Sequence, residues 1–283
     1  MLKDMTFGQY YPTRSFVHRL DPRIKILLLI AYIVMVFVAQ NFLSLAAAII
    51  FMLISVISSR VPITSVLKSI RGIIFIVIFT AILNVFFYGN PEGETPLFWV
   101  VTRGGLVNAG FLALRLVALV MGSAVLTLTT TPVSLTDGIE SLLKPLSLVK
   151  FPVHELALIM SIALRFIPTL ADEADRIMNA QKARGADFES GNLFSRIKAL
   201  VPVLIPLLIS AFRRADELGD AMDARCYSGA KKRTKYKKLR LGIRDLVAVL
   251  TAAAFMTGLI FLNVYYAEAI SFFARIFAAA FGG

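Results

Sequence analysis

The sequence predicts an all-α, polytopic integral membrane protein with about five transmembrane helices and two long amphipathic helices. Three observations support this fold class. Hydrophobic residues make up 58% of the 283 residues and the mean hydropathy is +0.76, whereas soluble domains are about 45–50% apolar. These residues are concentrated in long blocks with almost no charge. Two further apolar stretches continue into charged segments with the spacing of amphipathic helices.

Five apolar blocks are the predicted membrane spans. A bilayer core of about 30 Å needs about 20 helical residues, so the two longest blocks can cross it unaided. The three shorter blocks are below this length. Gln40 and Asn41 separate the first two blocks, which predicts a tight helical hairpin rather than one curved helix. The blocks are Ile24 to Ala39, Phe42 to Ile57, Ile73 to Phe87, Leu106 to Leu128 and Leu246 to Tyr266.

Basic residues predict the orientation. The net charge of +12 would suggest nucleic-acid binding in a soluble protein, but in a membrane protein it first reports topology, and we expect no nucleic-acid partner. Basic residues precede the first span and separate the second from the third, whereas the loop after the third span holds Glu92, Glu94 and only Arg103. The last span follows a strongly basic segment, Lys231 to Arg244. We therefore expect a cytoplasmic N-terminus and an external C-terminal tail.

This topology divides the chain into three regions. Residues 1–130 form a four-helix transmembrane part, residues 131–242 form a cytoplasmic or interfacial helical region, and residues 243–283 form the last transmembrane helix and tail. The middle region contains two apolar stretches, Leu156 to Leu170 and Leu200 to Phe212. As helices they would be about 22 and 20 Å long, short for a crossing. We expect long helices that lie partly in the inner leaflet and partly in water.

An alternative topology makes these two stretches a hidden transmembrane hairpin. Residues 171–199 would then lie outside, together with five basic side chains, against the tendency of basic residues to stay in the cytoplasm. Both topologies keep the two termini on the same sides, because a hairpin adds two crossings.

Apolar stripes run along both middle helices. Prolines within these helices predict kinks or helix ends. The stripes predict that the helices pack on each other or on a partner. The first stripe is Ala163, Ile167, Leu170, Ala174 and Ile177, the second is Ile197, Val201, Leu204, Leu208, Ala211, Ala215, Leu218 and Met222, and the prolines are Pro168, Pro202 and Pro206.

Catalytic signatures are missing from the sequence, which favours a protein that is not an enzyme. There is no phosphate-binding loop, no dinucleotide fingerprint and no nucleophile elbow. His154 and Glu155 begin like a zinc-protease motif, but Leu158 occupies the second histidine position. With one cysteine and two histidines, we expect no metal or cofactor site. Arg115 is the one good intramembrane candidate for ion coupling, and it can equally pair with a polar neighbour.

The two middle helices have similar ends. Ala171 to Gly185 and Ala215 to Cys226 both open with Ala-Asp-Glu and close with alanine, arginine and a small residue. Each arginine alone can be explained by the helix dipole, and Gly185 by a helix cap. A permanently charged guanidinium at an exposed helix end can also dock into a groove on another protein. Two such ends suit a partner with two similar grooves.

Several motifs resemble those of the transmembrane T component of energy-coupling factor transporters. They are AQKARG at Ala180 to Gly185, AMDARC at Ala221 to Cys226, LRFIP at Leu164 to Pro168, DPRIK at Asp21 to Lys25 and RGGL at Arg103 to Leu106. The resemblance covers most of the chain, and the paired arginine motifs are its most specific part.

The resemblance implies an ATP-driven importer of a micronutrient, a vitamin or a metal ion, in a bacterial or archaeal plasma membrane. Two cytoplasmic ABC-type ATPases, which bind the ATP and Mg²⁺, would hold the ends of two coupling helices, and a membrane-embedded S component would bind the substrate. The implied coupling residues are Ala183, Arg184 and Gly185, and Ala224, Arg225 and Cys226. Cys226 departs from the usual glycine or other small residue, which makes the second cap less certain.

Two other functions remain open from the residues alone. A stand-alone membrane carrier or channel would transport its substrate without partner subunits. A membrane-embedded enzyme acting on lipid would show clustered aspartates or histidines at a membrane boundary, and the sequence shows no such cluster.

Overall fold

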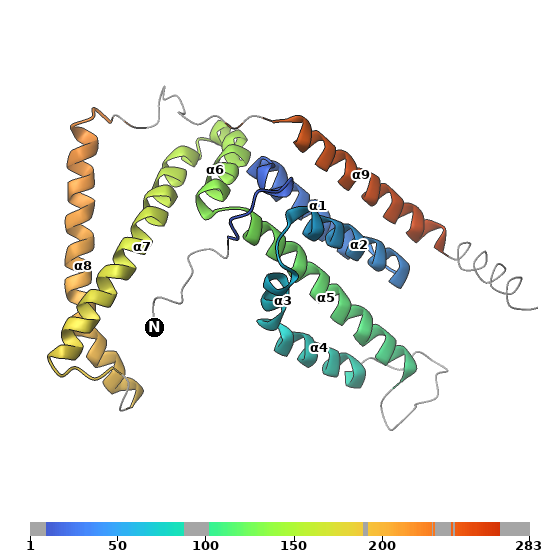
Figure 1. Cartoon of the computed structure of the whole chain (residues 1–283), viewed down its shortest axis with the longest axis horizontal. Coiled ribbons are helices and arrows are strands. Elements are labelled where there is room, and N and C mark those ends of the chain that lie inside the picture. Colours follow the sequence, from blue (N-terminus) through green and yellow to red (C-terminus); the bar gives the residue numbers. More distant parts are fainter. Residues whose placement is uncertain are drawn as a thin grey trace, which may run out of the picture. The chain divides into compact units, whose positions relative to one another are not determined.

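The computed structural model describes residues 10–87, 102–188, 192–227, 229, 239 and 241–266, and all regular structure in these ranges is helical (Figure 1). The all-α prediction is confirmed. The elements are η2 (Val17–Arg19), α1 (Pro22–Val38), α2 (Phe42–Ser59), α3 (Ile63–Arg71), α4 (Ile74–Phe87), α5 (Arg103–Thr129), α6 (Pro132–Leu143), η3 (Lys144–Val149), α7 (Val153–Ala183), α8 (Leu193–Asp223) and α9 (Ile243–Val264).

The chain divides into two compact units. The first, which we call the membrane unit, comprises Gly8–Thr131 and Leu239–Gly283 and holds α1 to α5 and α9. The second, the paired-helix unit, comprises Pro132–Lys238 with Met1–Phe7 and holds α6, α7 and α8. The chain therefore passes between the units after Thr131 and again before Leu239.

Four described helices are long and apolar enough to cross a bilayer, namely α2, α5, α7 and α9, and the bent pair of α3 and α4 makes a fifth if it forms one span. This confirms a polytopic membrane protein with about five spans. The set differs from the predicted one at two helices. The α1 helix has 17 residues and falls just short, and α7 is added because the helix already begins at Val153. α8 is outside the set.

The α1–α2 hairpin forms as predicted. α1 ends at Val38, α2 begins at Phe42, and the residues between them are not helical. Asn41 caps α2, because its backbone N–H donates to Ser44 Oγ at 3.2 Å while Ser44 occupies the third helical position. The break between the predicted spans is therefore set by local capping.

The core of the membrane unit lies where α1, α2, α5 and α9 meet. α5 also packs against α3 and α4. Tyr32 lies against Gly122, and a Cβ atom at Gly122 would overlap the tyrosine ring, so this close approach of α1 and α5 requires glycine. The Tyr32 hydroxyl donates to Ala118 O at 3.1 Å. The largest fully buried apolar side chains are Met35, Leu45, Leu259, Val36 and Val66.

α7 and α8 are each 31 residues long and pack against each other as an antiparallel pair (Figure 1). The prolines lie inside these helices, so they do not end them as one of the predicted alternatives required. Val203 is the one buried residue among the described side chains of α8. Most of the predicted apolar stripe is exposed, with Leu204 and Leu208 both at 58%. The contact between the two helices is confirmed, and the α8 side chains that bond to α7, Ser210 and Arg214, lie outside this stripe.

Candidate functional site: the arginine ends of the paired helices

The end of α7 is a complete helix cap centred on Arg184. Gly185 follows with a φ of +88°, a conformation that favours glycine. The N–H of Gly185 donates to Lys182 O at 3.0 Å, and the N–H of Ala186 donates to Gln181 O at 3.0 Å. These two bonds define a Schellman motif, so the end of the helix is fixed by the backbone and Arg184 is its C-cap residue.

The end of α8 repeats this geometry around Arg225. Cys226 has a φ of +57°. Its N–H donates to Asp223 O at 2.8 Å, and the N–H of Tyr227 donates to Met222 O at 3.0 Å. The same Schellman motif is therefore present, with cysteine in the position that glycine holds in α7. The second cap, which the sequence left less certain, has the same hydrogen bonds as the first.

Arg184 and Arg225 consequently occupy equivalent positions, each one residue before a left-handed residue. Both are exposed, as are the flanking Ala183 and Ala224. Among the described residues, neither guanidinium has a hydrogen bond or ion pair with another side chain. Both guanidinium groups are available for a partner.

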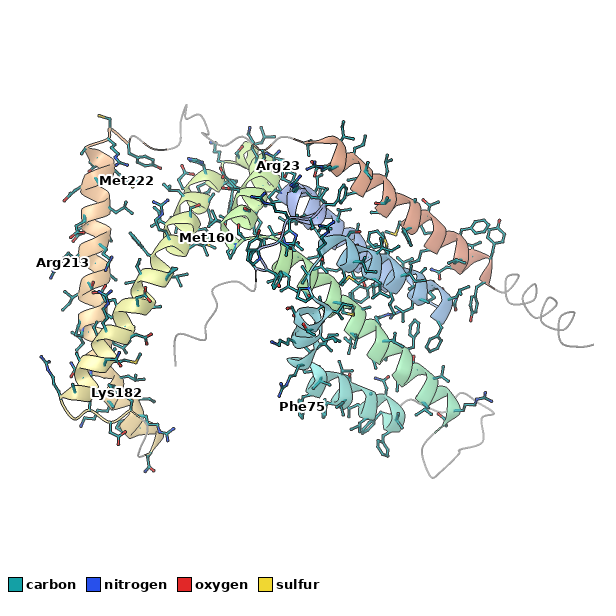
Figure 2. The ribbon with its side chains drawn as sticks, viewed as in Figure 1. Arg23, Phe75, Met160, Lys182, Arg213 and Met222 are labelled. Atoms are coloured by element: carbon teal, nitrogen blue, oxygen red, sulfur yellow. The ribbon has the colours of Figure 1, made fainter. Side chains whose placement is uncertain are left out.

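The two arginine ends lie at opposite ends of the helix pair. Figure 2 shows Lys182, two residues before Arg184, at one end of the pair, and Met222, three residues before Arg225, at the other. This arrangement follows from the antiparallel packing of α7 and α8. One partner groove cannot receive both ends, whereas two separate grooves can.

An ion pair braces the two helices between these ends. Arg214 on α8 donates from Nη2 to Glu173 Oε2 on α7 at 2.6 Å, and the Ser210 hydroxyl donates to Glu173 Oε1 at 2.6 Å. Both carboxylate oxygens are thus engaged from one neighbouring helix. The sequence analysis missed this brace, because no spacing rule pairs residues 41 positions apart.

A buried polar junction holds the end of the membrane unit where the chain leaves and re-enters it. Asp245, in the first turn of α9, is 6% exposed. Its Oδ1 accepts the N–H of Asp21 at 2.8 Å and its Oδ2 accepts the N–H of Gly242 at 2.7 Å. The Asp21 side chain in turn accepts the N–H of Arg23 at 3.0 Å and caps α1. The start of α1 is therefore tied to the start of α9.

Lys25 extends this junction to the end of α5. Its Nζ donates to Thr129 O at 2.9 Å, to Thr130 Oγ1 at 3.2 Å and to His18 O at 3.4 Å. The ammonium therefore satisfies a carbonyl at the end of α5, directly before the chain passes to the paired-helix unit. Burial lowers the pKa of the His18 imidazole below its ordinary value. The sequence marked the DPRIK motif but not its partner Asp245.

Arg115 has a structural partner in the α1–α2 turn. Its Nη2 donates to Ala39 O at 2.5 Å, and its guanidinium lies 4.6 Å from the centre of the Phe111 ring. Asn263 on α9 donates to the neighbouring Val38 O at 2.8 Å. The arginine pairs with a polar neighbour, one of the two interpretations that the sequence left open, and it holds the turn between two spans.

The fold and the paired ends define a class: a multi-span helical membrane protein that presents two matched cationic helix ends. Residues 13–236 match the family CbiQ, described as cobalt transport protein. The chain is 54% identical over 254 residues to the energy-coupling factor transporter transmembrane protein EcfT of Clostridium kluyveri, a match that covers 89% of this chain and 94% of that protein.

Other relatives have the same description. The EcfT protein of Bacillus subtilis is 46% identical over 266 residues, which cover 93% of this chain and 100% of the relative. That of Thermosediminibacter oceani is 47% identical over 259 residues, 91% of this chain and 97% of the relative. The chain therefore belongs to the family of transmembrane T components of energy-coupling factor transporters, as the motifs indicated.

Proposed function

We propose that this T component is the scaffold that couples two ABC-type ATPases to a membrane-embedded S component in a micronutrient importer of a bacterial or archaeal plasma membrane. The observation that carries the proposal is the matched pair of arginine ends. Arg184 and Arg225 have the same cap position, the same exposure and no internal partner among the described residues. A vitamin or a metal ion is the proposed substrate, bound by the S component.

The proposed mechanism uses the helix pair as a rigid transmission element. ATP and Mg²⁺ bind to the two ATPases, whose closure moves the grooves that hold the two arginine ends. Each guanidinium offers five N–H donors in a fixed plane, which suits carboxylates or carbonyls in a groove. Because the Glu173–Arg214 brace links the helices between their ends, a displacement of either end is passed to the other helix.

The exposed apolar stripe of α8 is the surface through which the motion of the helix pair would reach the S component. Ile197, Leu204 and Leu208 are 58–60% exposed and lie along the helix at spacings of seven and four residues. An apolar helix face of this length needs a lipid or protein surface to cover it. We propose that it lies in the inner leaflet against the membrane-embedded S component.

Charge reversal at the two ends tests this proposal. If the arginines only complement helix dipoles, Arg184→Glu and Arg225→Glu should each cost about 0.3–1 kcal/mol with uptake nearly intact. If they anchor the ATPases, each change should weaken uptake, since losing one member of a buried charge pair costs about 2–5 kcal/mol of binding. The double variant should release the ATPases during copurification while the S component stays bound.

Arg213→Glu is the matched control, because Arg213 is an exposed arginine on α8 without a side-chain partner among the described residues. It should leave uptake and copurification unchanged. Normal uptake with bound ATPases in the double variant would reduce both motifs to helix caps. Uptake by the purified chain alone in vesicles, without ATPase subunits, would instead support the stand-alone carrier.

A further inference from the structure

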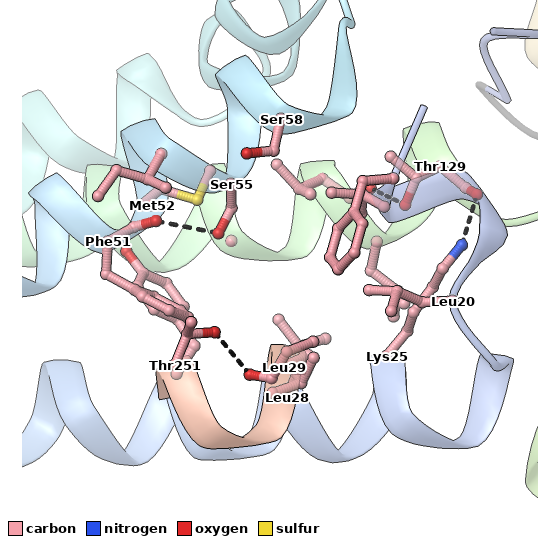
Figure 3. Close-up of a pocket in the computed structure, with 18 of the residues that line it drawn as sticks. Leu20, Lys25, Leu28, Leu29, Phe51, Met52, Ser55, Ser58, Thr129 and Thr251 are labelled. Atoms are coloured by element: carbon pink, nitrogen blue, oxygen red, sulfur yellow. Dashed lines mark hydrogen bonds between the residues drawn. The ribbon is translucent and has the colours of Figure 1, made fainter. Parts of the chain in front are cut away.

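A crevice of about 420 Å³ lies between helices of the membrane unit (Figure 3). This volume is in the range of sites that hold small molecules. The lining residues with exposed side chains belong to α2 and α9, with Phe16 beside them, so the mouth opens between these two helices. The exposed residues on the helices are Ile54, Ser58, Val247 and Thr251.

The closed side of the crevice is apolar and well defined. Phe51 on α2 and Phe255 on α9 meet with ring centres 5.1 Å apart, which joins the two helices along one side of the opening. Leu28 and Tyr32 from α1 and Gly122 from α5 form part of the wall. The crevice is therefore bounded by four helices and open between two of them.

Apart from the exposed Ser58 at the mouth, whose hydroxyl has no hydrogen bond among the described residues, the side-chain polar groups in the wall are already satisfied. Ser55 donates to Phe51 O at 2.9 Å, and Thr251 donates to Ala248 O at 2.9 Å (Figure 3). The three protons of Lys25 Nζ have the three acceptors described above. No donor in this group is left for a polar ligand, and such a wall favours a hydrocarbon chain.

Two exposed arginines stand within three residues, in the sequence, of residues that line the mouth. Ser58 is the next-to-last residue of α2, and Arg60 follows that helix. Val247 lies near the start of α9, and Arg244 precedes it by three residues, on the same helix face. Neither arginine has a side-chain partner among the described residues. Two unpaired guanidinium groups beside an apolar crevice match a phosphate joined to an acyl chain.

We propose that this crevice binds an anionic phospholipid, with one acyl chain between α2 and α9 and the phosphate at Arg60 and Arg244. The lipid belongs to the leaflet in which α1 and α9 begin. The lipid would occupy the crevice at the end of the helix bundle where the Asp21–Asp245 junction lies. This site is separate from the arginine ends and does not depend on the proposed coupling function.

Lipid retention tests the headgroup contact. The full-length chain, purified in mild detergent, is incubated with equal amounts of dioleoyl phosphatidylglycerol and dioleoyl phosphatidylcholine, and the retained lipids are quantified by native mass spectrometry. The wild type should retain phosphatidylglycerol in preference. Arg60→Asn, which tolerates the left-handed backbone, and Arg244→Gln should each reduce that preference about fivefold, because one basic residue near an anionic surface contributes about 1 kcal/mol.

Arg71→Gln is the control for these charge changes, because Arg71 is exposed at the end of α3, a helix that contributes no residue to the crevice. Thr251→Phe tests the chain site by filling the mouth, and it should reduce retention of both lipids. Ala253→Phe adds the same ring at an exposed position of α9 that does not line the crevice, and retention should stay unchanged.

Equal retention of the two lipids by the wild type would overturn the proposal. So would equal effects of Thr251→Phe and Ala253→Phe, because the crevice would then not hold the chain. The proposal would also be overturned if the wild type retained no more phospholipid than Thr251→Phe. A protein helix would then be the better candidate for the crevice. The arginine variants change exposed side chains, so they remain informative if the phenylalanine variant folds poorly.

Discussion

Gly185 and Cys226 have the same left-handed backbone conformation at the ends of α7 and α8, with φ values of +88° and +57°. Glycine enters this region freely, whereas a residue with a Cβ atom is strained there. The same two hydrogen bonds nevertheless close both caps. The chain thus maintains an unfavourable conformation at Cys226, and Arg225 precedes its left-handed residue as Arg184 does.

The first prediction concerns these caps. Cys226→Gly should stabilise the protein by about 1 kcal/mol, and Gly185→Ala should destabilise it by about 1–2 kcal/mol, because a Cβ atom is added in the left-handed region. The measurement is the shift in Tm of the chain purified in detergent. Gly219→Ala is the control, since Gly219 lies inside α8 with open space around it, and it should stabilise by about 0.5–1 kcal/mol. A stabilising Gly185→Ala would contradict the cap geometry.

The second prediction concerns topology. Reporters inserted near residues 185 and 235 should both be cytoplasmic, and one near residue 93 should be external, as the distribution of basic residues indicates. The test also decides the placement of α7, which is long and apolar enough to be a span. An external reporter near residue 185 would make α7 a transmembrane helix and would remove the proposed ATPase contact at Arg184.

The third prediction concerns the buried junction. Asp245→Ala leaves the N–H groups of Asp21 and Gly242 without their acceptor. Gly242 is exposed, so its N–H can bond to water, whereas the buried N–H of Asp21 would stay unsatisfied at a cost of about 1–3 kcal/mol. The variant should lose about that much stability, measured as a lower Tm. Asp220→Ala, which changes an exposed carboxylate on α8, should remain within about 0.5 kcal/mol of the wild type. Equal Tm values for the two variants would show that the junction does not support the fold.

The fourth prediction concerns the brace between the paired helices. The Glu173 and Arg214 side chains are 26% and 39% exposed, so the loss of their ion pair should change the stability of the chain little. Uptake should fall more than stability, because the helices would then move separately. Glu173→Arg and Arg214→Glu should each impair uptake, and the double exchange should restore much of it.

The control for this exchange is a neighbouring pair of residues on the same two helices. Asp172 and Arg213 have no side-chain partner among the described residues, so exchanging their charges should show no rescue. The double-mutant cycle compares the two pairs directly. Additive effects at Glu173 and Arg214 would argue that the brace has no role in coupling.

Much of the helical architecture follows from local sequence rules. The hairpin at Gln40 and Asn41 was predictable because polar residues interrupt an apolar run. The arginine ends are predictable from a repeated sequence pattern, and Gly185 indicates a helix cap because glycine is favoured at that position. The cap at Cys226 was less predictable, because its left-handed conformation is imposed by surrounding hydrogen bonds rather than by the residue type.

Contacts between helices that are distant in the sequence could not be predicted from local sequence rules. Asp245 pairs with Asp21 across 224 positions, and no periodicity within either helix records this contact. The stripe on α8 has correct helical spacing, yet it is mostly exposed, and the α8 side chains that bond to α7 are Ser210 and Arg214, outside the stripe. Amphipathic spacing predicts that an apolar helix face packs against another surface, but it does not identify that surface.

The bond between Asp21 and Asp245 also has a consequence for how the protein is made. The first helix of the membrane unit is synthesised more than two hundred residues before its partner, so the N–H of Asp21 lacks this acceptor until the last span emerges from the ribosome. The hydrogen bond from Asp21 to Asp245 therefore forms only after α9 has been inserted. A nascent chain that stops before Asp245 lacks this bond, so an incomplete product differs from the finished protein at the start of α1.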